Sequence, residues 1–282
     1  MWPCGSTSKL TGEHVFSDWL NRVPLVPPGQ EWHMHITRDG GRAPIVRTSP
    51  VLDQTICRYC LDCNTGWMSD IEGEAHHVVT PLILGQRASL SPTDQLMLAT
   101  WATLRAYVIE ASQIGGERDV LATSVDYAAM YAEHRPSSET LVHVARFAEP
   151  CGIYAWPCYG RGWVADGVDL VQWSTTIVIG HLVLRVCGRD GGTPGKLSVL
   201  APEFAELPSY NANGVYRIWP PAPYTIQFPP PRQLTRQTII DFATEPLPQM
   251  STQRPDALLC PACGTLHEDN PELASGITPA IA

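Results

Sequence analysis

The sequence contains very little lysine and no long apolar run. Only two of its 19 basic residues are lysines, Lys9 and Lys196, so 17 are arginines. Arginine suits bidentate phosphate contacts, but the abundant alanine and proline favour GC-rich coding as the better explanation of this ratio. The most apolar stretch, Ile177 to Val186, is too short to span a bilayer and contains His181. We therefore expect no membrane partner.

The amino terminus also lacks the marks of a signal peptide. It begins Met1-Trp2-Pro3-Cys4-Gly5, without a basic region or an apolar core. Nine cysteines, several of them in Cys-x-x-Cys pairs, are typical of metal ligands rather than disulfides. These features together predict a reducing, cytoplasmic compartment. The formal net charge of −9 argues against a protein that coats DNA indiscriminately.

The first third of the chain is predicted to combine short strands, a loop and a helix. A strand is expected around Glu13 to Trp19. Residues 25 to 50 are rich in proline and glycine and predict a loop or a loose hairpin, with Trp32 to Ile36 as the strand-like run. A helix is expected from near Thr65 to about Val79, ahead of Pro81.

The rest of the chain turns from helical to β-rich. Ser91-Pro92-Thr93-Asp94 has the form of a capping box, and the helix that follows, Leu96 to Ala111, is apolar on nearly every face and should be buried. A second helix is expected over Val125 to Glu133. From Thr140 the sequence predicts strands, with a bulge or a bend at Gly180. The fold class expected is α+β.

Two short motifs carry the candidate chemistry. A Cys-x-x-Cys knuckle folds backbone around zinc, and Cys60-Leu61-Asp62-Cys63 has that spacing. The next residue, Asn64, is held rigidly and offers an oxygen of the kind that binds magnesium. Glu13-His14 adds a second hard ligand beside an imidazole that could act as a base. This set of groups suits metal-assisted cleavage of a phosphodiester.

These motifs resemble those of the HNH, or ββα-metal, finger endonucleases, in the zinc-containing branch that includes phage recombination endonuclease VII. That pattern runs Cys-x-x-Cys, then Asp/Glu-His on a strand, then Cys-x-x-Cys-Asn opening a helix. The matching residues are Met1 to Gly5, Glu13 to Phe16, and Cys60 to Met68. The strings LTGEHVFSDWL and CNTGWMSDIE also resemble phage and actinobacterial proteins of this kind, which implies a bacterial or phage-infected cell.

The resemblance is incomplete at its first knuckle. Met1 stands where the first cysteine would fall, so Cys4 is the only ligand from that arm unless the natural start lies upstream. Cys57 could fill the gap, because Cys57, Cys60 and Cys63 follow one another at three-residue intervals. His33 and His35 are weaker candidates.

The resemblance, which covers residues 1 to about 85, and the pattern of elements after it together predict three parts. Residues 1–85 would form an HNH-like zinc finger nuclease domain, residues 86–140 a helical segment, and residues 141–282 a β-rich accessory domain. The last part carries a second knuckle, Cys260-Pro261-Ala262-Cys263. It could reach back to complete the amino-terminal zinc site or bind a zinc ion of its own, and the sequence leaves both open.

The implied function is a metal-dependent endonuclease acting on DNA. Glu13 and Asn64 would hold one Mg²⁺ or Mn²⁺, His14 would be the general base, and zinc would be purely structural. The alternative is a catalytically degenerate zinc finger that binds nucleic acid or protein without turnover. A protein partner or a homodimer stays open.

Individual residues also have plainer explanations. Asn64 could cap the helix that it opens rather than bind a metal. Glu72 is expected to orient a neighbour or to pair with an arginine. Trp19 and Trp67 are expected in the core of the amino-terminal unit rather than as platforms for bases.

Overall fold

The computed structural model describes residues 4, 8–24, 31–38, 42–113, 124–163, 169–190, 214–244 and 258–259. Helices and antiparallel sheets are both present, so the predicted α+β class is correct. The strands are β1 (Leu10–His14), β2 (Glu31–Arg38), β3 (Arg42–Pro50), β4 (Thr55–Cys60), β5 (Ala88–Leu90), β6 (Leu141–Trp163), β7 (Asp169–Asp190), β8 (Val215–Trp219), β9 (Ile226–Phe228) and β10 (Leu258–Leu259). The helices and helical turns are η1 (Asp18–Arg22), η2 (Val51–Asp53), α1 (Leu61–Cys63), η3 (Asn64–Met68), α2 (Ser69–Ile83), α3 (Pro92–Gln113), α4 (Ser124–Glu133) and α7 (Arg236–Thr244).

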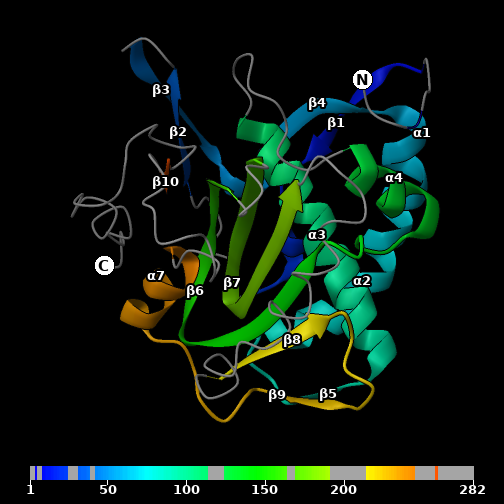
Figure 1. Ribbon diagram of the computed structural model, residues 1–282, viewed down its shortest axis with the longest axis vertical. Coiled ribbons are helices and arrows are strands. Elements are labelled where there is room, and N and C mark those ends of the chain that lie inside the picture. Colours follow the sequence, from blue (N-terminus) through cyan, green and yellow to red (C-terminus); the bar gives the residue numbers. More distant parts are fainter. Residues whose placement is uncertain are drawn as a thin grey trace.

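The long strands β6 and β7 form the antiparallel centre of the molecule (Figure 1). β8 pairs with the first part of β6, and β10 with its far part. Successive residues of a strand face opposite sides of its sheet. Leu182 and Leu184 accordingly belong to the cluster that contains α3, whereas Val183 belongs to a second cluster with Ile239 and Phe242 of α7. The sheet is therefore covered by α3 on one face and by α7 on the other.

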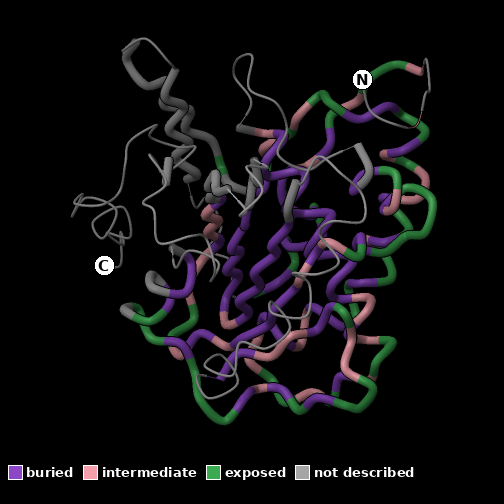
Figure 2. Tube along the Cα trace, viewed as in Figure 1, coloured by how far each residue is buried: buried purple, intermediate pink, exposed green. Residues whose placement is uncertain are grey.

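We call the described residues up to 85 the amino-terminal unit. The larger of these clusters also contains side chains from this unit. Phe16 and Leu20 belong to it together with Trp101 of α3 and Ile177 of β7, and all four side chains are almost fully buried. Figure 2 shows that buried residues follow one another along the central strands. One continuous core thus joins the first strand of the chain to the central sheet.

In the amino-terminal unit the hairpin of β2 and β3 stands between β1 and β4 in the sequence, and α2 follows β4. β1 pairs with β4 antiparallel, with Leu10 opposite Cys60 and His14 opposite Thr55. The register shifts by one residue between Thr11 and Glu13. β4 then leads through α1 and a π-helical turn, η3, into α2. This order brings β1 alongside the start of the helical segment.

The predicted strand around Glu13 to Trp19 is too long. β1 ends at His14, the Val15 N–H donates to the Gln54 carbonyl at 2.9 Å, and a 3₁₀ turn begins at Asp18. The buried side chains that follow are Val15, Phe16, Trp19 and Leu20. Their spacing does not alternate as a strand requires, because the chain turns here to bury both sides of the segment.

The predicted end of the helix before Pro81 is also wrong. α2 continues through Pro81 to Ile83 because Leu82 and Ile83 are fully buried, which offsets the backbone bond that proline cannot make. The helix ends in a Schellman motif: the Gln86 N–H donates to the Pro81 carbonyl at 2.9 Å and the Gly85 N–H to the Leu82 carbonyl at 3.0 Å. Gly85 has the positive φ of 68° that this ending needs.

The predictions for the next two helices are confirmed. The capping box is present, because the Ser91 N–H donates to Asp94 at 2.9 Å and the Asp94 N–H to the Ser91 hydroxyl at 3.2 Å. α3 and α4 lie where the sequence places them. Gly180 marks a bulge within β7 rather than a bend between two strands, since the register with β6 shifts around its partner Cys151. α7 was not predicted.

Of the two alternatives predicted for residues 25 to 50, the structure shows the hairpin, formed by β2 and β3. β2 and β3 pair antiparallel from Glu31 opposite Pro50 to Arg38 opposite Arg42. The strand-like run Trp32 to Ile36 lies within β2. Across the described ranges, no helix is long and apolar enough to cross a membrane.

Candidate functional site

Three cysteines meet where β4 passes into α1. Cys60 ends β4 and caps α1, accepting a hydrogen bond on its Sγ from the Cys63 N–H at 3.4 Å. The Sγ atoms of Cys4 and Cys60 are 3.6 Å apart, and those of Cys4, Cys60 and Cys63 all lie within 4.8 Å of one another. Tetrahedral zinc with bonds of about 2.3 Å would separate two sulfurs by about 3.8 Å. The three thiols therefore fit three ligands of a structural zinc site.

The thiols differ in how readily they ionise. Burial opposes ionisation of Cys60, but hydrogen bonds from the backbone and side chain of Cys63, and from Ser8 and Cys4, outweigh it and lower the pKa of Cys60 to about 7. Burial raises the pKa of Cys63 to about 12, against a hydrogen bond from Trp67. Neighbouring thiolates repel, so a bound cation would be required before all three sulfurs could ionise.

The other predicted zinc ligands lie elsewhere or outside the described residues. Cys57 is exposed on β4 and is not among the sulfurs brought together. Cys260 and Cys263 lie outside the described residues. The strand just before Cys260, β10, pairs with Tyr159 and Gly160 of β6, and Figure 1 shows β10 well away from α1. His33 and His35 lie on β2, and nothing is described of their side chains.

We expect the protein to contain tightly bound zinc that depends on Cys60 and not on Cys57. Cys60→Ser should remove the zinc and unfold the amino-terminal unit, because metal binding and folding are coupled at such sites. Cys57→Ser, an equally small change three residues earlier, should leave the zinc content unchanged. Elemental analysis and thermal unfolding of both variants provide the measurement. Equal zinc contents in the two variants would contradict this assignment.

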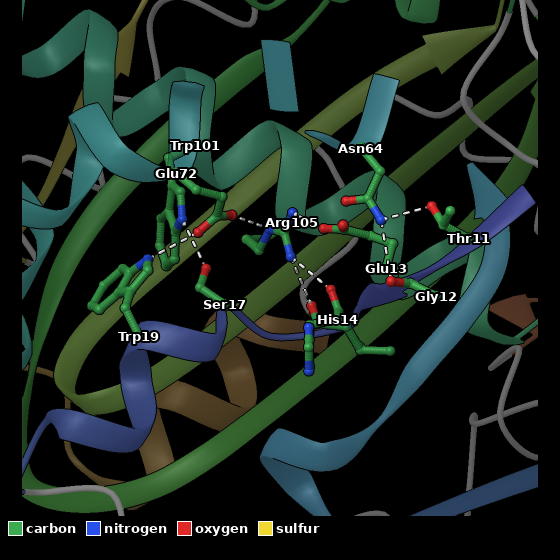
Figure 3. A network of polar contacts seen from close by, with 11 residues as sticks. Thr11, Gly12, Glu13, His14, Ser17, Trp19, Asn64, Glu72, Trp101 and Arg105 are labelled. Carbon is green, nitrogen blue, oxygen red and sulfur yellow. Dashed lines mark hydrogen bonds and ion pairs between the residues drawn. The ribbon is translucent and has the colours of Figure 1, made fainter. Parts of the chain in front are cut away.

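The side chain of Asn64 connects the helical segment to β1. Its Nδ2 donates to the Thr11 hydroxyl at 2.9 Å and to the Gly12 carbonyl at 3.1 Å. A carbonyl can only accept, so this contact fixes which end of the amide is nitrogen. Asn64 does not cap the amino-terminal end of the helical segment, because Cys60 is the N-cap residue of α1. Figure 3 shows the remaining Asn64 oxygen turned toward Glu13.

Glu13 is buried and is held by an arginine from α3. One of its carboxylate oxygens accepts from the Arg105 Nη2 at 2.7 Å, and the side chains of Arg105 and Glu13 are 1% and 9% exposed. Among the described residues, no hydrogen bond reaches the second oxygen of Glu13. The Glu13 carboxylate and the Asn64 oxygen lie on the same side of β1 and face one another (Figure 3).

His14 lies beside Glu13 on β1 but points elsewhere. Its imidazole leaves the strand in a different direction from the Glu13 carboxylate, as adjacent residues of a strand do (Figure 3). The side chain is half-buried, and its backbone carbonyl accepts from the Arg105 Nη1 at 2.8 Å. The structure thus brings Glu13 and Asn64 together and holds His14 on the same strand without joining it to them.

Arg105 is the residue of this region that sequence reasoning missed. It is fully buried and also pairs with Glu72, with 2.9 Å between its Nε and a Glu72 oxygen. The prediction that Glu72 pairs with an arginine is therefore confirmed. The sequence contained a signal for this contact. Arg105 is the single arginine of a helix predicted to be buried, and a buried arginine must pair with a carboxylate or a carbonyl.

Trp19 and Trp67 have mainly structural contacts. Trp19 is buried, as predicted, and its indole N–H donates to Glu72 at 2.9 Å. Trp67 packs against the core in a half-buried position and stacks on His134, with 6.0 Å between ring centroids.

In comparisons with known proteins, no family model matches the sequence, and no curated protein or solved structure is significantly similar to it.

Proposed function

We propose that the protein is a metal-dependent endonuclease of the HNH class that hydrolyses phosphodiester bonds in DNA. Two features support this proposal: β1 pairs antiparallel with β4, which leads into the helical segment, and three thiols cluster at the start of that segment. In this proposal the unit is a zinc-stabilised finger. The zinc site would be structural, with no coordination position open to substrate, and Mg²⁺ or Mn²⁺ would take part in the reaction.

The orientation of the Asn64 side-chain amide is the main support for this proposal. Its amide nitrogen donates to the carbonyl of Gly12, so its oxygen faces Glu13, and no residue that the structure describes donates a hydrogen bond to this oxygen. A carboxylate oxygen and an amide oxygen are both hard ligands of the type that Mg²⁺ prefers. Two protein ligands with water and phosphate oxygens in the remaining positions are typical of magnesium sites that act on phosphates.

The chain's own residues have separate tasks in this proposal. Glu13 and Asn64 hold the cation, which when bound would stabilise negative charge that develops on the phosphate. His14 takes a proton from the attacking water. In-line attack places the entering and leaving oxygens on opposite sides of phosphorus. A base that points away from the cation ligands is compatible with that requirement.

One observation favours the alternative, a finger that binds nucleic acid or protein without turnover. The Glu13 carboxylate already has a buried cationic partner in Arg105, at 2.7 Å. A carboxylate with a purely structural role would make the same contact. Under this alternative the zinc site and the fold persist, and DNA binds without being cut.

We expect the protein to nick supercoiled plasmid DNA in Mg²⁺ or Mn²⁺ and to lose this activity in EDTA. Asn64→Ala should raise the Mn²⁺ concentration needed for half-maximal nicking, because it removes one of two protein ligands. Thr65→Ala is a suitable control, since its exposed side chain donates to the Leu61 carbonyl at 2.9 Å and, among the residues described, makes no hydrogen bond with Glu13 or Asn64. DNA retention in a gel-shift assay without nicking under any divalent ion would instead establish the binding module.

A further inference from the structure

The Arg105 guanidinium binds both the side chain and the backbone of the Glu13-His14 segment. Its Nη2 donates to the Glu13 carboxylate at 2.7 Å, and its Nη1 to the His14 carbonyl at 2.8 Å. The third nitrogen, Nε, faces Glu72 at 2.9 Å (Figure 3). The planar fork of arginine can reach three acceptors in fixed directions, whereas the ammonium of lysine is a single point of charge.

The charges around Arg105 do not balance. One guanidinium faces two carboxylates, with 2.7 Å to an oxygen of Glu13 and 2.9 Å to an oxygen of Glu72. The second oxygen of Glu72 is occupied by the Trp19 indole N–H at 2.9 Å. The second oxygen of Glu13 has no such donor among the described residues. The single positive charge of Arg105 is thus shared between two carboxylates and cannot neutralise both.

We infer that Arg105 is the positioning residue of the cation site at Glu13 and Asn64, and that Glu72 keeps this site negative by sharing the charge of Arg105. This inference rests on the proposed function. Arg105 binds one oxygen of Glu13 and so leaves only the other for a cation. Without Glu72 the full positive charge of Arg105 would act on Glu13, and a divalent cation would bind there less well.

The inference is tested by Mn²⁺ binding to the full, zinc-loaded chain, followed by electron paramagnetic resonance, and by the Mn²⁺ concentration that half-saturates plasmid nicking. Glu72→Gln should weaken Mn²⁺ binding by about 10- to 100-fold, as changes just behind a metal ligand commonly do. Nicking at saturating Mn²⁺ should recover. Glu74→Gln removes the same charge from an exposed position on the same helix and should change neither quantity.

Arg105→Lys provides the second variant. This substitution keeps the positive charge but removes the planar guanidinium that reaches several acceptors. We therefore expect weaker Mn²⁺ binding in this variant too, with its zinc content retained. If folded Glu72→Gln protein binds Mn²⁺ as tightly as the parent, the network is only structural and the inference is wrong, even if the parent cuts DNA. A parent protein that neither binds Mn²⁺ beyond its zinc nor cuts DNA would instead overturn the proposed function itself.

Discussion

His14→Ala is expected to abolish DNA cleavage while leaving zinc content and thermal stability nearly unchanged. In the proposed function this side chain only removes a proton, a task commonly worth ~10²–10⁴ in rate. The fold should tolerate the change because Arg105 binds the carbonyl of His14 and not its ring. Plasmid nicking under saturating Mn²⁺, beside zinc analysis and thermal unfolding, gives the measurement.

The matched control for this variant is His77→Ala. His77 is exposed on α2 and lies outside the contacts around Glu13. Its replacement should change neither cleavage nor stability. If His14→Ala cuts DNA as fast as the parent does, the base lies elsewhere and the binding module becomes the better account of the amino-terminal unit.

Arg105→Met is expected to lower the free energy of unfolding by about 3–5 kcal/mol. The substitution leaves Glu13 and Glu72 buried without their cationic partner. Urea unfolding followed by circular dichroism measures the loss. Arg135→Met is the control, because Arg135 pairs with Glu133 at an exposed site, where such a pair contributes about 0–1 kcal/mol.

A combined variant separates charge from packing. Replacing both carboxylates as well, in Glu13→Gln/Glu72→Gln/Arg105→Met, should restore much of the lost stability, since removing every member of a buried charged group is far less costly than removing one. An Arg105→Met protein as stable as the Arg135→Met control would show that the buried pairs contribute little.

The elements that could be predicted from the sequence are those specified by neighbouring residues. The capping box fixes the start of α3 through contacts three residues apart. The bulge at Gly180 and the strands around it follow from local pattern as well. The three thiols were also within reach, because two of them share a knuckle spacing.

The features that sequence reasoning missed depend on contacts between distant segments. α2 runs past Pro81 because Leu82 and Ile83 are buried against the rest of the core. The partner of Glu13 lies 92 residues away in Arg105. Spacing alone also favoured Cys57 as a zinc ligand, but it is exposed in β4, close to where the register with β1 shifts.

The shared core has a consequence for how the amino-terminal unit opens. The Trp101 indole donates to Ser17 at 3.2 Å, and its ring lies 5.9 Å from that of Trp19, so α3 completes the packing of the first segment. A fragment ending near residue 85 would lack Trp101 and would leave the side chains of Ser17 and Trp19 in contact with water. The amide hydrogens of β1 should accordingly exchange with solvent only when the whole molecule opens. The geometry around Glu13 is thereby protected by the cooperativity of the entire fold rather than by its own few hydrogen bonds.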